Sequence, residues 1–165
     1  MIGYRQMVEA ADEVGLRLEI VGGLPVWEAS PVIKHQRAID RIRATIRRAG
    51  PGENACACVH FADIQIRFPD GSHKRPDISI FCREPDEQDE EVTLLPEAVI
   101  EVLSRGYEPK DLEVGVPFYR RMGIPDILVL DPDTGAVLHY HRGEPARELV
   151  SPAEIALARG CRCTV

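Results

Sequence analysis

Two stretches of the sequence decide the fold: RPDISIF at residues 75–81 and LPEAVIEVLS at residues 95–104. Both are rich in β-branched and apolar residues, as is typical of strands that other elements cover on both faces. Each stretch also carries a carboxylate, Asp77 in the first and Glu101 in the second. Because burying a charged side chain is costly unless it has a partner, the two strands predict a site that binds a positive charge.

Two carboxylates at the ends of adjacent strands suit a hard divalent cation. Proteins hold Mg²⁺ with one or two carboxylates, and water and substrate phosphate complete the octahedron. Asp77 and Glu101 therefore indicate metal-assisted chemistry on a phosphate ester. Two plainer interpretations compete. A Pro-Asp pair also suits a turn, and the two acidic residues could form structural ion pairs with arginines such as Arg75 or Arg105.

The motifs around these strands occur in an order and spacing that resembles the putative restriction endonuclease family, which belongs to the PD-(D/E)XK nuclease superfamily. The likeness extends from the segment EIVGG at residues 19–23 to about Tyr140. It is carried by these motifs: Arg75-Pro76-Asp77, the strand end Glu101-Val102-Leu103-Ser104, Asp111 followed by Tyr119, and GIPDILVLDP at residues 123–132. The resemblance implies an α/β fold with a mixed central sheet flanked by helices, and an endonuclease that hydrolyses DNA phosphodiester bonds with Mg²⁺ or Mn²⁺.

The same resemblance implies roles for individual residues. Asp77 and Glu101 would hold the metal together with the backbone carbonyl of Val102, and the cation would lower the pKa of the attacking water. An acidic residue in the segment of Glu19 can approach the metal, so Glu19 is a candidate auxiliary acid. Strand alternation also allows Glu19 to face solvent. His35 lies where the family carries a His near the cleft.

The sequence departs from its relatives at the catalytic lysine. The superfamily carries a Lys two residues after the Glu, where this chain has Leu103, and the family carries one on the next helix, where this chain has Gly115. That Lys orients the attacking water and stabilises charge that develops on the phosphate. Lys110 is close enough in sequence to replace it. The alternative is a catalytically silent nuclease-fold module for DNA binding or assembly.

Length and charge limit the number of domains and the class of protein. The chain has 165 residues, 44% of them hydrophobic, and no long uncharged apolar run, which predicts one domain over residues 1–165 and no membrane span. The net charge is −7, and an acidic loop at residues 84–93 contributes six of the negative charges, leaving −1 for the rest. DNA is the partner that the family resemblance implies, and a second copy of the chain, in a homodimer, is a further expected partner. The N-terminal residues lack a secretion signal, so a cytoplasmic location is expected.

The five cysteines predict reduced thiols, because an odd number suits free thiols better than a disulfide framework. Cys56-Ala-Cys58 and Cys161-Arg-Cys163 are spaced more tightly than zinc ligands usually are, and no His pair accompanies them. We interpret them as small residues on strands. His139 and His141 share one face of a strand, but no acidic partner is evident in the sequence, and we interpret them as surface residues.

Periodicity and turn residues predict the other elements. Helices are expected over residues 3–14, 31–49 and 109–122, strands over 16–21, 24–28, 58–68, 73–82, 126–130 and 136–141, and a short helix with a tail over 142–165. Ser30 is the expected N-cap of the second helix, whose arginines either contact a phosphate backbone or form a solvated face. Asp63 is a candidate supporting group, and Pro117 predicts a kink in the third helix.

Overall fold

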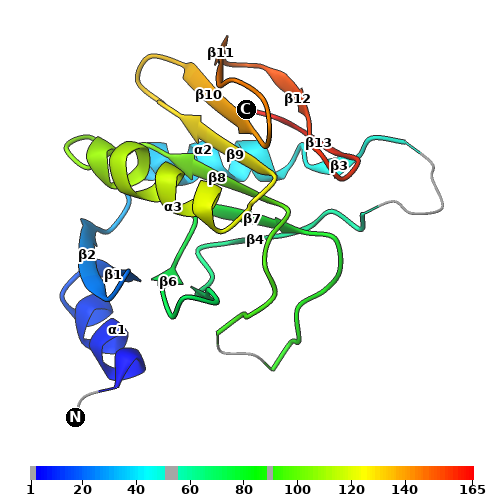
Figure 1. Ribbon diagram of the computed structural model, residues 1–165. Helices are drawn as coiled ribbons and strands as arrows, with labels where there is room; N and C mark the ends of the chain where they lie inside the picture. Colours follow the sequence, from blue (N-terminus) through cyan, green and yellow to red (C-terminus); the bar gives the residue numbers. More distant parts are fainter. Residues whose placement is uncertain (1–2, 51–55, 89–90) are drawn as a thin grey trace.

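The computed structural model of the chain describes residues 3–50, 56–88 and 91–165 (Figure 1). Its largest sheet has the strand order β11-β10-β9-β8-β7-β4. The bounds of these strands are Val59–Ala62 (β4), Ile78–Phe81 (β7), Ala98–Val102 (β8), Asp126–Leu130 (β9), Ala136–His141 (β10) and Arg147–Val150 (β11). β8 and β9 run parallel and the other neighbours are antiparallel, so the sheet is mixed, as predicted.

Helices cover both faces of this sheet (Figure 1). α2 (Ile33–Arg43) buries an apolar stripe against one face, and α3 (Val116–Arg121) packs against the other. Alternate residues of a strand point to opposite faces, so Ile100 packs on the α2 side and Val99 on the α3 side. This double cover explains why the central strands are apolar throughout.

A smaller sheet, with the order β2-β1-β6-β5, lies below the large one in Figure 1. Its strands are Leu16–Val21 (β1), Leu24–Ala29 (β2), Ile66–Arg67 (β5) and His73–Lys74 (β6). The β1–β2 hairpin turns at Gly22 and Gly23 with φ of +57° and +82°, which glycine tolerates. α1 (Tyr4–Glu13) packs on Leu18 of β1. Leu18 faces α1, so its neighbours Arg17 and Glu19 face the other way.

The predicted strands at residues 58–68 and 73–82 are each divided between the two sheets, which corrects the expectation of one long hairpin. β4 ends at Ala62, and Asp63 turns the chain with φ +54° before β5 begins. Residues 75–77 separate β6 from β7. Asp77 therefore lies at the junction of the two sheets.

The C-terminal prediction of a short helix and a tail is wrong. Residues 147–164 form β11, β12 (Glu154–Ala156) and β13 (Cys161–Thr164), and β13 pairs with β3 (Arg47–Arg48). The second helix consequently ends at Arg43 rather than near residue 49. The Thr45 hydroxyl accepts the N–H of Thr164 at 2.8 Å, which ties the chain after the helix to β13.

The starts and interiors of two helices also differ from expectation. Val32, not Ser30, is the N-cap of α2, because the Ser30 hydroxyl donates to the Gly15 carbonyl at 3.0 Å. The third predicted helix begins as a π-helix, η1 (Lys110–Gly115), before it continues as α3. Pro117 lies in the first turn of α3, directly after the π-helix, so the missing N–H falls where the regular α-helical hydrogen bonding is already interrupted. No helix among the described residues has the length and apolar character that a membrane span requires.

The cysteines also correct the prediction. The structure pairs Cys56 with Cys82 and Cys58 with Cys161 in disulfides, and only Cys163 is a buried free thiol. The expectation of reduced thiols is therefore wrong for four of the five cysteines in this structure.

Candidate active site

A cluster of buried ionisable side chains lies where the two sheets and η1 meet. Each of its members is at most 8% exposed. They are Arg17 and Glu19 from β1, Glu28 from β2, His35 from α2, Lys74 from β6, Asp77 before β7, Glu101 from β8, and Lys110 and Asp111 from η1. The cluster brings together Glu19, Asp77, Glu101 and Lys110, the side chains that the sequence singled out as candidates for catalysis.

The two carboxylates of the opening motifs contact each other through the backbone. The N–H of Asp77 donates to Glu101 Oε2 at 3.1 Å, and the N–H of Val102 donates to Asp77 Oδ2 at 2.8 Å. Arg17 Nη1 donates to Asp77 Oδ1 at 3.2 Å, and the Tyr119 hydroxyl donates to Glu101 Oε1 at 2.6 Å. The strand pairing of β7 with β8 thus fixes Asp77 and Glu101 side by side.

His35 lies against two of the proposed metal ligands. Its Nε2 is 2.7 Å from the Val102 carbonyl oxygen and 3.2 Å from Asp77 Oδ2. Burial lowers the pKa of His35, but Asp77 and the Val102 carbonyl outweigh it and raise the pKa. The Val102 carbonyl oxygen and Asp77 Oδ2, two predicted cation ligands, therefore both contact the same atom, His35 Nε2.

Glu19 faces the cluster and not solvent. Lys74 Nζ donates to Glu19 Oε2 at 2.5 Å, and the N–H of Arg75 donates to Glu19 Oε1 at 2.8 Å. Burial alone would raise the pKa of Glu19, but Lys74 and Lys110 hold it at about 2. The interpretation of Glu19 as a solvent-facing strand residue is wrong, because only 3% of it is exposed.

Lys110 and Asp111 form the side of the cluster next to η1. Lys110 Nζ lies 3.0 Å from Glu28 Oε2 and 2.9 Å from Asp111 Oδ1. Burial raises the pKa of Asp111 to about 6 in spite of Lys110. Burial, with Asp111 and Asp77 as negative neighbours, raises the pKa of Glu101 to about 8. Burial is the largest cause of both raised pKa values, and negative neighbours add to it.

The net charge of the cluster can be counted. Five carboxylates in the cluster, Glu19, Glu28, Asp77, Glu101 and Asp111, face three permanent cations, Arg17, Lys74 and Lys110. When all five carboxylates are ionised and His35 is neutral, two negative charges remain, which equal the charge of one divalent cation; without a cation, the raised pKa of Glu101 removes one of them by protonation at pH 7. The donor set also fits, since carboxylate and carbonyl oxygens are the ligands that Mg²⁺ prefers.

Arg17, Glu28 and Lys74 are the residues of the cluster that the sequence reasoning missed, and Lys74 matters most for the chemistry. A Cβ added to Gly115 would lie 3.8 Å from Lys74 Nζ, and the same nitrogen lies 5.2 Å from the centre of the Tyr119 ring. The Lys74 ammonium therefore occupies the region that a lysine at position 115 would enter. Its position three residues before Asp77 was the only signal in the sequence.

A second buried cluster corrects the interpretation of the histidines. Asp126 Oδ1 lies 2.7 Å from His139 Nε2 and 2.8 Å from His141 Nδ1, and Asp126 Oδ2 accepts the N–H of Ala158 at 2.7 Å. His139 is buried, so it is not a surface residue. Asp126 stands opposite His141 in the β9–β10 pairing, and drawing that hairpin register would have found it.

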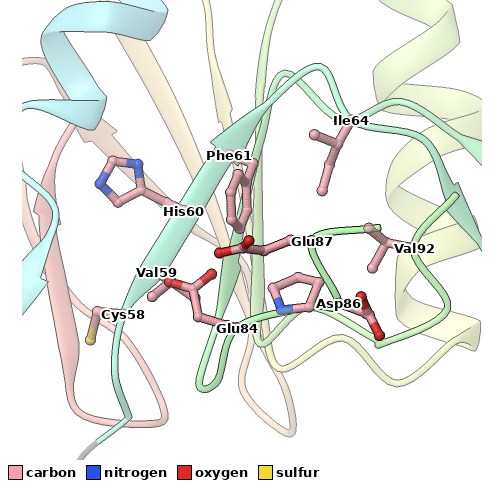
Figure 2. A pocket seen from close by; sticks show the side chains of 10 residues that line it. Cys58, Val59, His60, Phe61, Ile64, Glu84, Asp86, Glu87 and Val92 are labelled. Atoms are coloured by element: carbon pink, nitrogen blue, oxygen red, sulfur yellow. The ribbon is translucent and has the colours of Figure 1, made fainter. Parts of the chain in front are cut away.

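Two cavities lie on different sides of the site. One of about 390 Å³ reaches His35, with Lys34, Ser104 and Arg105 on its walls. The other, of about 680 Å³, lies beside the edge strand β4, where Glu84, Asp86 and Glu87 of the acidic loop surround it with His60 and Phe61 (Figure 2). None of the cluster residues lines this second cavity. Asp89 and Glu90 of the loop lie outside the described residues.

A mixed sheet with buried carboxylates at the junction of β7 and β8 defines a protein of the restriction-endonuclease-like class. A family model described as Putative restriction endonuclease (Uma2) matches residues 4–160, and the chain belongs to this family. Its fold is similar to the crystal structure of a putative nuclease belonging to DUF820 from Anabaena variabilis ATCC 29413. The TM-score is 0.65 and the identity 20%, over 84% of this chain and 80% of that chain. No curated protein matches.

Proposed function

We propose that the protein is an endonuclease that hydrolyses DNA phosphodiester bonds with Mg²⁺ or Mn²⁺ at the buried cluster. The observation that carries the proposal is the excess of buried carboxylates, five against three Arg and Lys side chains, in the cluster of Asp77 and Glu101, in a member of a nuclease family. Asp77, Glu101 and the Val102 carbonyl would hold the ion. When bound, a divalent cation supplies Lewis-acid chemistry, which lowers the pKa of water and offsets charge on phosphate.

The protein's own residues support this chemistry in separate ways. Arg17 and the N–H of Val102 fix the orientation of the Asp77 carboxylate, and Tyr119 does the same for Glu101. Their hydrogen bonds reduce the reorganisation that binding a cation requires. The cavity beside His35 offers the phosphate a route to the cluster.

Lys74 supplies the positive charge for which the family uses a lysine at position 115. Its ammonium is held by Glu19, which makes Glu19 a positioning residue for that cation. Lys110, the replacement that the sequence suggested, lies between Glu28 and Asp111. We prefer Lys74 to Lys110 as the catalytic cation, because Lys74 Nζ lies beside Gly115 and over the Tyr119 ring.

A catalytically silent DNA-binding module is the second candidate. One observation favours it: each oxygen of Asp77 and Glu101 already accepts a hydrogen bond from the protein. In such a module the cluster would be a structural ion-pair network, and the acidic residues would bind no metal or bind it without turnover.

Metal-dependent melting and plasmid nicking test the proposal together. Mg²⁺ or Mn²⁺ should raise the melting temperature of the wild type. At a metal concentration a hundredfold above Kd, the free energy of unfolding should rise by about 2.7 kcal/mol. Asp77→Asn and Glu101→Gln should abolish both this rise and the nicking of supercoiled DNA. Glu97→Gln, a control just before β8, should keep both. Equal responses in all variants would remove the site from Asp77 and Glu101, whereas metal binding without nicking would select the silent module.

A further inference from the structure

Four cysteine sulfurs gather in one place at the end of the large sheet. Cys56 and Cys58 precede β4, Cys82 follows β7, and Cys161 begins β13. The Sγ atoms of Cys56, Cys58 and Cys161 all lie within 4.8 Å of one another, and Cys82 Sγ is bonded to Cys56. The two disulfides are therefore one cluster of four sulfurs.

This grouping differs from the two Cys-x-Cys pairs of the sequence. Cys163 does not belong to the group. Its thiol is buried, and burial together with the negative charge of Asp126 raises its pKa to about 12. Cys82 takes its place. Residue spacing alone does not reveal this group, because β4, β7 and β13 converge only in the folded chain.

The grouping of the two disulfides also suits a metal site once the four sulfurs are reduced. A disulfide needs two sulfurs, and nothing in its chemistry brings a second bridge into contact with it. In a tetrahedral zinc site with Zn–S bonds of about 2.3 Å, neighbouring sulfurs lie about 3.8 Å apart, which is compatible with the observed grouping. Structural zinc sites of this kind use four protein ligands and no open position.

We propose that in the reduced protein Cys56, Cys58, Cys82 and Cys161 bind one Zn²⁺ as a structural tetrathiolate site. Reduction of the two disulfides takes four electrons and four protons, which two equivalents of a dithiol supply. Zinc binding then displaces the four thiol protons. The site joins the start of β4 to β13, whose cysteines are 103 residues apart in sequence. It is independent of the proposed Mg²⁺ site.

Zinc uptake by the reduced full-length protein tests the proposal. The protein is reduced with a phosphine, freed of metal and oxygen, and given Zn²⁺ before desalting. Elemental analysis should find one zinc per chain, and X-ray absorption should find four sulfur neighbours at about 2.3 Å. Co²⁺ in place of Zn²⁺ should show sulfur-to-metal charge-transfer absorption. Zinc should also raise the melting temperature of the reduced protein.

Matched variants separate this site from other cysteines and from the nuclease proposal. Cys58→Ala and Cys82→Ala should lose the zinc. Cys163→Ala, which removes a buried cysteine of the same strand as Cys161, should keep it, and so should Asp77→Asn. If the first two variants fail to fold, the absorption spectrum of the wild type decides. Reduced wild type that takes up no zinc, or zinc bound mainly by nitrogen or oxygen, would overturn the proposal.

Discussion

Lys74 lies beside Gly115, the position at which the family resemblance implies a lysine, and the two residues can therefore be tested as a pair. Changing Lys74 alone would leave Glu19 buried without its cation, which costs about 3–5 kcal/mol. The double variant Lys74→Met/Glu19→Gln removes both charges. We expect it to lower nicking by about a hundredfold to a thousandfold, the loss typical of one electrostatic group that stabilises the transition state. Its Mg²⁺-dependent melting should persist.

The matched control is Lys110→Met/Glu28→Gln, which removes the neighbouring ion pair. It should retain nicking within about tenfold of the wild type, since an effect on positioning alone is smaller than the loss of the stabilising group. The reverse result, full activity in the Lys74 variant and loss in the Lys110 variant, would make Lys110 the catalytic cation, as the sequence had suggested.

Moving the lysine gives a second test at this scale. A Lys at position 115 would place its Cβ 3.3 Å from the Lys110 carbonyl oxygen and 3.8 Å from Lys74 Nζ. Gly115→Lys alone should therefore lower the melting temperature, because two ammonium groups would compete for one space. In the Lys74→Ala background the same change should recover nicking at least tenfold. No recovery in a folded double variant would show that Lys74 does not replace the family lysine.

The candidate residues that could be predicted from the sequence share one property: each lies in a short motif of consecutive residues. Asp77, Glu101 and Val102 stand in two short strands, and the resemblance supplied their roles. Arg17 and Lys74 could not be found that way. A charged residue that alternates with apolar ones on a strand is typical of a solvent-exposed face, and only the packing of the smaller sheet against the larger one turns these residues inward.

At the scale of elements, the Asp126 cluster ties β9, β10 and the segment before β13 together. Burial raises the pKa of Asp126, but His139, the N–H of Ala158 and His141 outweigh it and lower the pKa. A carboxylate that ionises more readily in the folded protein contributes stability that is present above its unfolded pKa, about 3.9. This contribution is lost as the pH falls through the lower folded pKa.

Asp126→Asn should therefore lower the free energy of unfolding at pH 7, by about 3 kcal/mol for the loss of a buried charged partner. It should also flatten the fall in stability as the pH drops below about 4. Chemical unfolding across that range measures both effects. Asp40→Asn, which removes an exposed acid from α2, should behave like the wild type. An acid-induced fall as steep in Asp126→Asn as in the wild type would contradict this role.

The elements that the sequence failed to predict share a physical cause. β3, β12 and β13 are only two to four residues long; β3 gains its hydrogen bonds from β13, which is distant in sequence, and β12 and β13 form a short hairpin. Neither alternation nor propensity reports pairing over so few residues. By contrast, α1, β1, β2, β9 and β10 were predicted nearly to the residue, because each carries its own periodicity or turn signal.

For the whole molecule, the proposed site exists only because two sheets, η1 and α2 meet at one junction. The distribution of charge around that junction is uneven. The acidic loop lies along the edge strand β4, where Glu84, Asp86 and Glu87 line a cavity. Its far end is tied to β6 by Glu91, which pairs with His73, the neighbour of Lys74. Through Glu91 the loop brings negative charge near the Lys74 end of the cluster, although none of its described residues lines the cavity beside His35.

Neutralising the loop should strengthen DNA binding. Glu84→Gln, Asp86→Asn and Glu87→Gln together remove three like charges, and at low salt the screening length of about 10–30 Å allows them to act on a bound phosphate backbone. We expect several-fold tighter binding of a duplex at about 20 mM salt, and a difference that shrinks as salt is raised. Glu144→Gln, Glu148→Gln and Glu154→Gln change the net charge equally but lie around β11 and β12. Equal tightening in both variants would mean that net charge alone matters, and that the loop does not face the DNA.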